Sequence, residues 1–295
     1  MSMNGIDIAS YQSDMDCSVV DADFVIIKIT QGDYYNNPSF PKQYKQCKDS
    51  GKLVGMYHYS NGVVPASSEV DHLLKFASPY LGKALVCLDW ETNGATKQKG
   101  LNTKFSSGIE VSYTMEWIEH FYSKTGIFPV IYMSSSVTRR SYWGPVASRC
   151  PLWVAKYAND ELTGYKSSPA ADPKGYGAWN NPIIIQYTPS GSIKGYEQTA
   201  KHKLDLDMAY ITKNEWLDFQ NGSPVLKQYQ EVTPKLVKDI LDGVYGNGLE
   251  RREKLSNAGY NLLEVQAIVN KVIKAKKDMD ICKKDLGKYY ECICP

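Results

Sequence analysis

The sequence predicts an α/β protein, with a closed barrel over about the first 210 residues and a small helical module after it. Three observations lead to this prediction. Eight short apolar runs recur along the first part of the chain, separated by helical or turn-rich stretches. Most of these runs are nearly continuous in Val and Ile, which is typical of strands buried on both faces. After about residue 218 the composition changes, and helical patterns replace the strand-like runs.

The order of the elements makes the predicted barrel regular in its first half and irregular in its second. Helix candidates at 40–50, 67–80 and 110–124 separate the early runs, whereas Gly, Pro, Asn and Ser fill the inserts after residue 157. In such barrels the chemistry lies at the carboxyl ends of the strands. The eight predicted strands are residues 5–12, 24–30, 53–60, 84–91, 128–135, 152–157, 183–188 and 203–210.

The remainder of the chain predicts a separate three-helix module. We expect a barrel over 1–219, a linker over 220–230 that contains the turn-rich Asn-Gly-Ser-Pro, a module over 231–275 and an unassigned tail over 276–295. Two helical patterns, 234–244 and 263–275, flank a Gly-Asn-Gly break. By their helical spacing the predicted core positions of the module are Val237, Ile240, Leu241, Leu255, Tyr260, Val265 and Val269.

Composition and charge exclude several classes of protein. A net charge of +2 is too small to argue for a nucleic-acid partner. No run approaches the ~20 apolar residues of a membrane span. The first residues show no basic and apolar leader, so we expect synthesis in a cytoplasm without a signal peptide.

The cysteines predict neither a metal site nor a disulfide framework. Cys17, Cys47, Cys87 and Cys150 are scattered and are expected to be reduced, buried residues. The last three cysteines, Cys282, Cys292 and Cys294, have no C-x-x-C spacing or nearby His that would complete a zinc site. No metal or other cofactor is expected. A disulfide near the end of the chain stays an alternative if the protein reaches an oxidising exterior.

The run Ala-Leu-Val-Cys-Leu-Asp-Trp-Glu over 84–91 carries the strongest chemical signal. Residues i and i+2 of a strand point to the same face, so Asp89 and Glu91 are expected side by side, with Cβ atoms about 6–7 Å apart. Two close carboxylates cannot both ionise freely, and the one with the raised pKa can donate a proton near neutral pH. Cleavage of a glycosidic bond needs such a pair. The alternative is a strand end that leads into a solvated acidic loop.

The ordered set of motifs resembles glycoside hydrolase family 25, over roughly residues 4–215. The matching pieces are GIDIASYQ, IKITQG, GMYHYS, LDWE, IYMSS, LWVAKY, IQYT and LDLD. The resemblance implies an irregular TIM-like (β/α)5(β)3 barrel and a lysozyme-type N-acetylmuramidase. It makes Asp7, Asp89, Glu91 and Asp205 the acidic centre, with Glu91 as the acid, and it puts Asp207 where the family usually has Asn. The alternative role for Asp7 and Asp205 is to tie barrel loops together.

Aromatic and polar residues at the strand ends complete the candidate substrate site. Tyrosine and tryptophan rings there can stack on sugars, although core packing is an equal alternative for each. Lys28 is expected to support the acidic residues, and His58 to orient a neighbour or pack in the core. The candidate substrate-binding residues are Lys28, Tyr57, His58, Tyr59, Tyr132, Trp153, Gln186, Tyr187 and Asp207.

Residues 232–273 resemble the CW-seven type of cell-wall-binding repeat, through the pattern GxYGNGxERRxxLxxAGY. The resemblance implies binding to peptidoglycan muropeptides. An alternative for the paired arginines is a solvated helix start. The candidate wall-binding residues are Gly246, Asn247, Gly248, Arg251 and Arg252.

Together these resemblances imply a phage-type endolysin that acts on bacterial peptidoglycan after its release from the cell. It would cut the β-1,4 bond between N-acetylmuramic acid and N-acetylglucosamine. Two alternatives stay open: a bacterial autolysin of the same activity, and a catalytically silent wall-binding protein. Attack by the substrate's own acetamide and direct displacement by water also remain alternatives. Because a single repeat is a weak anchor, homo-oligomerisation through the module is a further option.

Overall fold

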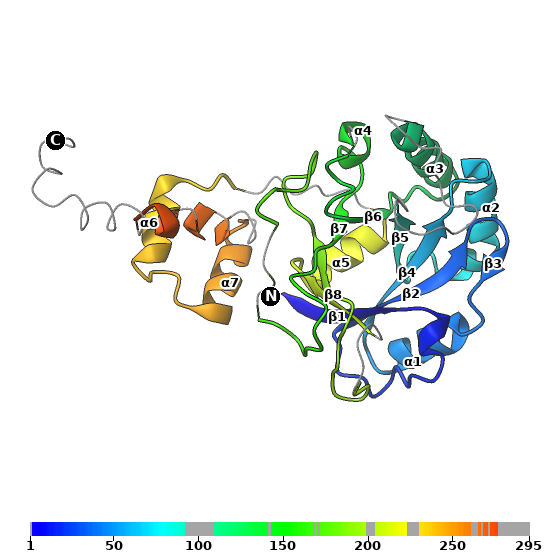
Figure 1. Ribbon diagram of the computed structural model, residues 1–295, viewed down its shortest axis with the longest axis horizontal. Helices are drawn as coiled ribbons and strands as arrows, with labels where there is room; N and C mark the ends of the chain where they lie inside the picture. Colours follow the sequence, from blue (N-terminus) through cyan, green and yellow to red (C-terminus); the bar gives the residue numbers. More distant parts are fainter. Residues whose placement is uncertain are drawn as a thin grey trace, which may run out of the picture. The chain divides into compact units, whose positions relative to one another are not determined.

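The computed structural model describes residues 2–91, 109–140, 143–167, 169, 172–198, 204–222, 230–260, 265–266, 268–270 and 272–276 (Figure 1). The chain forms two compact units, Ser2–Leu226 and Lys227–Pro295. Of the predicted tail over 276–295, residues 277–295 with the three cysteines lie outside the described residues.

The first unit is a closed barrel of eight strands, and all eight predicted strands are present. A parallel pairing between the first two barrel strands closes the sheet. A two-residue strand that the sequence did not predict, β3 (Tyr35–Asn36), pairs with the edge of β2. The barrel strands are β1 (Met3–Ile8), β2 (Phe24–Gln31), β4 (Leu53–Ser60), β5 (Leu85–Trp90), β6 (Val130–Ser134), β7 (Leu152–Ala155), β8 (Ile184–Thr188) and β9 (Asp205–Ala209).

Strand β9 departs from the parallel sheet that the apolar runs predicted. It runs antiparallel to both of its neighbours, β8 and β1. Asp205 is the first residue of β9, yet it pairs with Asp7 near the end of β1. The reversed strand therefore brings its amino end to the edge of the barrel where the other strands have their carboxyl ends.

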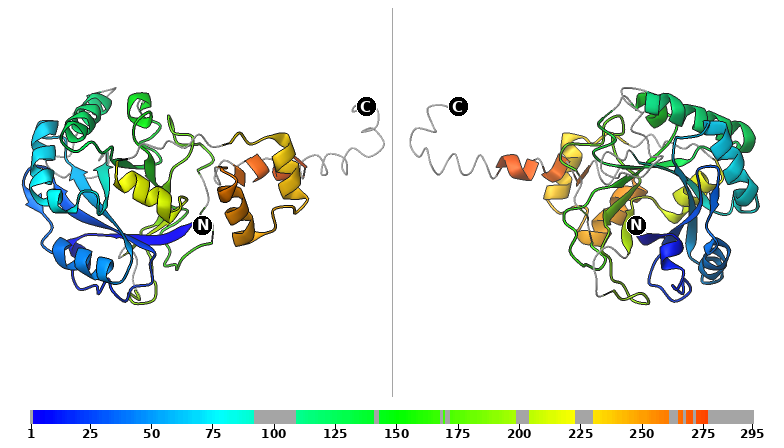
Figure 2. Two further views of the ribbon diagram at one scale, coloured as in Figure 1. Left: turned by 180° about the vertical axis from the view of Figure 1, so that it is seen from behind. Right: turned by 45° about the vertical axis from the view of Figure 1, so that its right-hand side comes forward.

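The three predicted helices follow strands of the first half and lie outside the barrel (Figures 1 and 2). The predicted helices at 40–50, 67–80 and 110–124 are confirmed. No helix is described between β7 and β9, which gives the irregular second half. The helical segments of this unit are η1 (Ser10–Gln12), α1 (Phe40–Asp49), α2 (Ala66–Ala77), η2 (Ser78–Tyr80), α3 (Ile109–Thr125), α4 (Gly144–Ala147) and α5 (Lys213–Gln220).

Helix α5 was not predicted, and it fills the amino end of the barrel. Thr212 and Glu215 form a capping box at its start, which is a local signal visible in the sequence. Trp216 of α5 is fully buried with its ring centroid 4.9 Å from that of Phe24. A Cβ on Gly5 would lie 2.3 Å from the Phe24 ring, so only glycine fits there. Large apolar side chains thus occupy one end of the barrel and leave the polar residues at the other.

The second unit contains α6 (Pro234–Leu241), α7 (Gly248–Asn257) and further helical residues at 265–266, 268–270 and 272–276. Thr233 caps α6 by accepting a hydrogen bond from the Leu236 N–H. The predicted core is confirmed, with Leu241 and Tyr260 packed against it rather than fully buried. The buried core residues are Leu236, Val237, Ile240, Leu255, Val265 and Val269.

Cys17, Cys47, Cys87 and Cys150 are buried and have free thiols, as predicted. No helix in the described ranges is both long and apolar enough to cross a bilayer.

Candidate active site

The candidate site lies at the polar end of the barrel, where alternate residues of each strand point inward. The inward row of β1 ends at Asp7, that of β5 at Asp89, and that of β9 begins with Asp205 and Asp207. Asp7 and Asp205 are direct partners in the β1–β9 ladder. Glu91 follows β5 on the same face as Asp89. The structure therefore brings the four predicted acidic residues, Asp7, Asp89, Glu91 and Asp205, to one end of the barrel, with Asp207 below them.

Asp89 and Glu91 differ in burial. Asp89 is 7% exposed, and its Oδ1 has no hydrogen-bond donor among the described residues. Burial and the nearby charge of Glu91 hold the pKa of Asp89 well above its usual range. Burial also raises the pKa of Glu91, while the positive charge of Lys28 opposes that rise. Both carboxyl groups are thus biased toward the protonated form, and the half-buried Glu91 is the more accessible of the two.

Lys28 reaches the same site from β2. Its ammonium group donates a 2.6 Å hydrogen bond to Gln31 Oε1 and lies 4.8 Å from the centroid of the Tyr59 ring. Burial lowers the pKa of Lys28, and the charges of Asp89 and Glu91 act in the opposite direction. Lys28 therefore supplies positive charge beside the carboxylate pair, as its position in the second strand suggested.

A directional network fixes Asp7. Gln186 Nε2 donates a 2.6 Å hydrogen bond to Asp7 Oδ2. The Gln186 carbonyl Oε1 accepts hydrogen bonds from the hydroxyls of Tyr132, at 2.8 Å, and Tyr157. Because two phenols donate to the amide oxygen, the amide nitrogen must face Asp7. Burial and the charge of Asp207 raise the pKa of Asp7 well above its usual range.

The structure separates the two aspartates of β9. Asp205 lies nearer the opening and is partly exposed, whereas Asp207 is fully buried. Asp207 Oδ1 accepts a 2.8 Å hydrogen bond from the indole nitrogen of Trp153. Of the two, Asp205 is the residue that a bound molecule can reach. Asp207 and Trp153 are buried and bonded to each other inside the barrel, and their contact with substrate stays a prediction.

His58 and Tyr187 do not face the barrel interior. His58 is fully buried on the outer side of β4, with Nδ1 2.8 Å from Thr30 Oγ1 and Nε2 3.3 Å from Glu69 Oε2. Tyr187 is buried, and its hydroxyl accepts the N–H of Lys166. Both side chains therefore point away from the predicted substrate site. Strand alternation explains both orientations, since Tyr57 and Gln186 point inward and their chain neighbours must point outward.

Three tyrosines predicted from the sequence line the inner face, and the structure adds a fourth. Tyr57, Tyr59 and Tyr132 belong to the inward rows of β4 and β6. Tyr157 was not predicted to be in the site. It follows β7 in the same inward row as Trp153, is 38% exposed and bonds to Gln186. The two-residue spacing from Trp153 was the signal that could have identified it.

In the second unit, the Gly-Asn-Gly break is a turn that Arg251 stabilises. Arg251 Nε donates to the Gly246 carbonyl at 3.0 Å, and a terminal nitrogen donates to Asn247 Oδ1 at 2.8 Å. Gly246 and Gly248 have φ of 73° and 55°, which favours glycine at both positions. The Arg252 side chain lies outside the described part of the chain. Of the predicted wall-binding residues, Gly246, Asn247 and Gly248 therefore lie in one turn, and Arg251 of α7 bonds to it.

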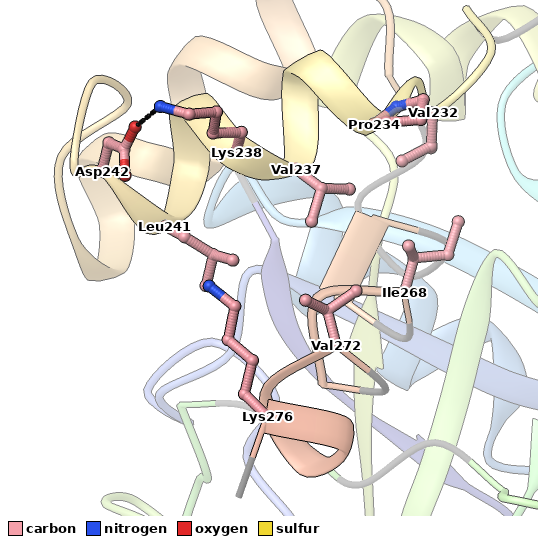
Figure 3. A pocket seen from close by; sticks show the side chains of 9 residues that line it. All are labelled: Val232, Pro234, Val237, Lys238, Leu241, Asp242, Ile268, Val272 and Lys276. Atoms are coloured by element: carbon pink, nitrogen blue, oxygen red, sulfur yellow. Dashed lines mark hydrogen bonds and ion pairs between the residues drawn. The ribbon is translucent and has the colours of Figure 1, made fainter. Parts of the chain in front are cut away.

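A cavity of about 460 Å³ lies between α6 and the helical residues 268–276 (Figure 3). Its floor is apolar. At one edge Lys238 and Asp242 form an ion pair, and Lys276 lies at another. The lining residues are Val232, Pro234, Val237, Lys238, Leu241, Asp242, Ile268, Val272 and Lys276. The sequence did not predict this cavity, because it forms between helices that are far apart in the chain.

Known proteins resemble both units. The family model described as glycosyl hydrolases family 25 matches residues 6–196, and the CW_7 repeat model matches residues 234–273. An N,O-diacetylmuramidase of Chalaropsis sp is 25% identical over 208 residues, which cover 65% of this chain and 93% of that protein. The lysozyme of Streptococcus phage Cp-7 is 24% identical over 276 residues, which cover 90% of this chain and 69% of that one.

Solved structures match about three quarters of this chain. A family GH25 lysozyme from Aspergillus fumigatus superposes with a TM-score of 0.59 at 21% identity, covering 75% of this chain and all of that one. A bacterial lysozyme from Streptomyces coelicolor gives a TM-score of 0.60 at 19% identity and similar coverage. At this identity the structural likeness supports the fold. With the family model matched over 191 of the 295 residues, this chain belongs to glycosyl hydrolases family 25 and carries a CW_7 repeat.

Proposed function

We propose that this protein is a peptidoglycan hydrolase that cleaves the β-1,4 bond between N-acetylmuramic acid and N-acetylglucosamine in Gram-positive cell walls. The observation that carries the proposal is the pair Asp89 and Glu91 at the open end of a family 25 barrel, in the same chain as a CW_7 repeat. Relatives named N,O-diacetylmuramidase and lysozyme support this substrate class.

Glu91 is the general acid in this proposal. It is the less buried of the two carboxyl groups, and its raised pKa keeps a proton available for the leaving oxygen. Asp89 lies two residues earlier on the same face and would stabilise the positive charge that develops at the sugar ring. Attack by the substrate's acetamide oxygen fits a D-x-E pair beside an N-acetyl sugar. Direct displacement by water, with inversion, is the competing path.

Asp205 and the inward tyrosines are the proposed substrate contacts. Asp205 is partly exposed beside Asp7, so its carboxylate can accept hydrogen bonds from the acetamide or from a water molecule. Tyr59 is partly exposed beside Lys28, and Tyr157 is 38% exposed. Tyrosine rings stack well on the apolar faces of sugars.

The second unit is proposed to hold the enzyme on the wall, with the Gly246–Gly248 turn and Arg251 as candidate contacts. Arg251 uses two donors to fix the turn and keeps further N–H groups for a carboxylate of the muropeptide. A phage endolysin is favoured over a bacterial autolysin, since the Cp-7 phage lysozyme aligns with 90% of this chain. Self-association through this unit remains a proposal that analytical ultracentrifugation would test.

The decisive experiment is digestion of purified Gram-positive peptidoglycan, followed by borohydride reduction and mass spectrometry. Muropeptides that end in reduced muramic acid would support the proposed bond. New reduced glucosamine ends would contradict the proposed bond, although the protein would still be a glycosidase. If the wall were bound and left uncut, the protein would be a wall-binding protein without this activity.

A further inference from the structure

Asp207 is a buried carboxyl group that the proposed mechanism does not use. It is fully buried, and Trp153 occupies one of its oxygens from below. The other oxygen, Oδ2, receives no donor from the nitrogen and hydroxyl groups of the described residues. A buried carboxylate oxygen without a donor is costly, so this atom requires a partner.

The hydrogen bonds around Asp207 show that the neighbouring donors are directed to other atoms. An indole nitrogen can only donate, so Asp207 Oδ1 is an acceptor. On the other side, Tyr132 and Tyr157 donate to Gln186, and Gln186 donates to Asp7 Oδ2. Every donor in this network therefore points toward the two aspartates.

Asp7 and Asp207 are diagonal neighbours on the inner face of the barrel, because Asp7 pairs with Asp205 and Gly5 pairs with Asp207 in the β1–β9 ladder. Gly5 has no side chain, and the charge of Asp207 raises the pKa of Asp7. Two ionised carboxylates have no donor between them and repel each other at close range. A hydrogen bond between them requires one proton. That proton would satisfy Asp207 Oδ2, which otherwise has none.

We propose that Asp207 is a positioning residue that shares one proton with Asp7, so that the pair carries one negative charge rather than two during catalysis. The idea deepens the proposed function, and only its activity measurement depends on that function. Its role is to hold Asp7 against Gln186 without adding a further negative charge to the site.

The charged groups that face the pair explain why loss of the shared proton, which adds a second negative charge, would matter. The neighbouring acids are Asp89, Glu91 and Asp205, and Lys28 is the only cation that the described strands turn inward. The weaker acids around the pair are Tyr57, Cys87, Tyr132, Tyr157, Tyr165 and Tyr187. Burial raises the pKa of Asp207 to about 8, with the Trp153 N–H opposing the rise. The shared proton is therefore retained at neutral pH and lost in mildly alkaline solution.

The first test is infrared spectroscopy of the wild-type protein, which needs no substrate and no variant. A shared proton gives a carboxylic-acid C=O band at neutral pH that disappears near the Asp207 pKa of about 8. The substitution Asp207→Asn should remove one such band, because the Asn amide then donates to Asp7 in place of the proton. Asp218→Asn, on the exposed side of α5, is the matched control and should leave the band in place.

The second test is the pH dependence of kcat/KM on a soluble glycan fragment. In the wild type, loss of the Glu91 proton and of the shared proton should give an alkaline limb approaching a hundredfold fall per pH unit. Asp207→Asn should reduce that slope to about tenfold per pH unit, which corresponds to one proton. A purely structural role of Asp207 would not change the slope.

The proposal is overturned if the wild type shows no carboxylic-acid band at neutral pH, or if Asp207→Asn keeps both the band and the two-proton slope. If the protein cleaved no glycan at all, the proposed function would fail, and the infrared titration would still decide whether the proton is shared.

Discussion

Gln186 Nε2 lies 2.6 Å from Asp7 Oδ2, which joins β8 to β1 across 179 positions of the sequence. Two tyrosine hydroxyls orient the Gln186 amide from its other end. Asp7 is thereby held in one position at the opening of the barrel. The bond shows that the acidic centre is organised by a supporting network as well as by the strands that carry it.

Replacing Gln186 by Leu should lower kcat by roughly tenfold and also destabilise the fold. The change removes the donor to Asp7 and leaves the buried Tyr132 hydroxyl without an acceptor, which costs about 1–3 kcal/mol. Activity and thermal unfolding should be measured together. Gln220→Leu is the control, since Gln220 is also buried and donates to Gly82 O but lies in α5. Equal loss of kcat in both variants would show that the network has no specific role.

Glu91→Gln should reduce kcat on peptidoglycan by about 10²–10⁴-fold, because the leaving oxygen would no longer receive a proton. Binding to walls should persist. On an aryl glycoside whose leaving group needs no protonation, the variant should recover most of its activity. Comparable losses on both substrates would indicate that Glu91 acts in some other way. In the wild type, activity should fall as pH rises through the raised pKa of Glu91, since only the protonated acid is competent.

His58→Ala should destabilise the protein while leaving KM for glycan fragments within about twofold of wild type. His58 lies between Thr30 and Glu69, outside the barrel, and its removal takes one hydrogen-bond partner from each of them, at a cost of about 1–3 kcal/mol. Glu69 keeps the bonds that Ser60 and two backbone N–H groups donate to it. Denaturant unfolding and steady-state kinetics at low temperature would measure the two effects. A large rise in KM in the folded variant would restore His58 to the substrate site.

The stability of the wild type should fall as pH rises from about 4 to about 8, relative to Asp207→Asn. In the folded state the pKa of Asp7 is well above its usual range and that of Asp207 is about 8, whereas an unfolded Asp titrates near about 3.9. The protonated pair therefore contributes its full stability below the unfolded value and loses it as pH rises through the folded values.

Each pKa unit corresponds to about 1.4 kcal/mol. The difference in unfolding free energy between the two proteins should therefore change by more than about 1 kcal/mol across this window. Thermal melts at several pH values measure it. A difference that does not vary with pH would mean that Asp207 does not titrate between the two states.

Deleting residues 227–295 should weaken binding to insoluble walls by at least tenfold and leave hydrolysis of soluble fragments within a few-fold. The barrel forms its own core, and the CW_7 repeat forms a separate one. Arg251→Lys is the finer change, because the single ammonium nitrogen of Lys does not reproduce the two separated nitrogens that donate to Gly246 and Asn247. If the truncated barrel lost activity on soluble fragments, the second unit would be part of the catalytic fold.

Much of the site could be predicted from the sequence, because the signals are local. The two-residue period of a strand places Asp89 and Glu91 on one face whatever the rest of the chain does. The same rule places His58 on the outer face of its strand once Tyr57 and Tyr59 face inward, so its position could also have been predicted from the sequence. The capping box of Thr212 and Glu215 is likewise a local signal that predicts the start of α5, a helix of eight residues.

By itself the sequence determined the eight strands, the resemblance to family 25 and the acidic pair, since each depends on periodicity or motifs within a few residues. Only the tertiary structure decided that β9 runs antiparallel, which brings Asp205 to the opening and Asp207 into the interior. It alone joined Gln186 to Asp7 and Trp153 to Asp207. These contacts depend on how the barrel closes, and closure is set by packing among strands far apart in the chain rather than by local preference.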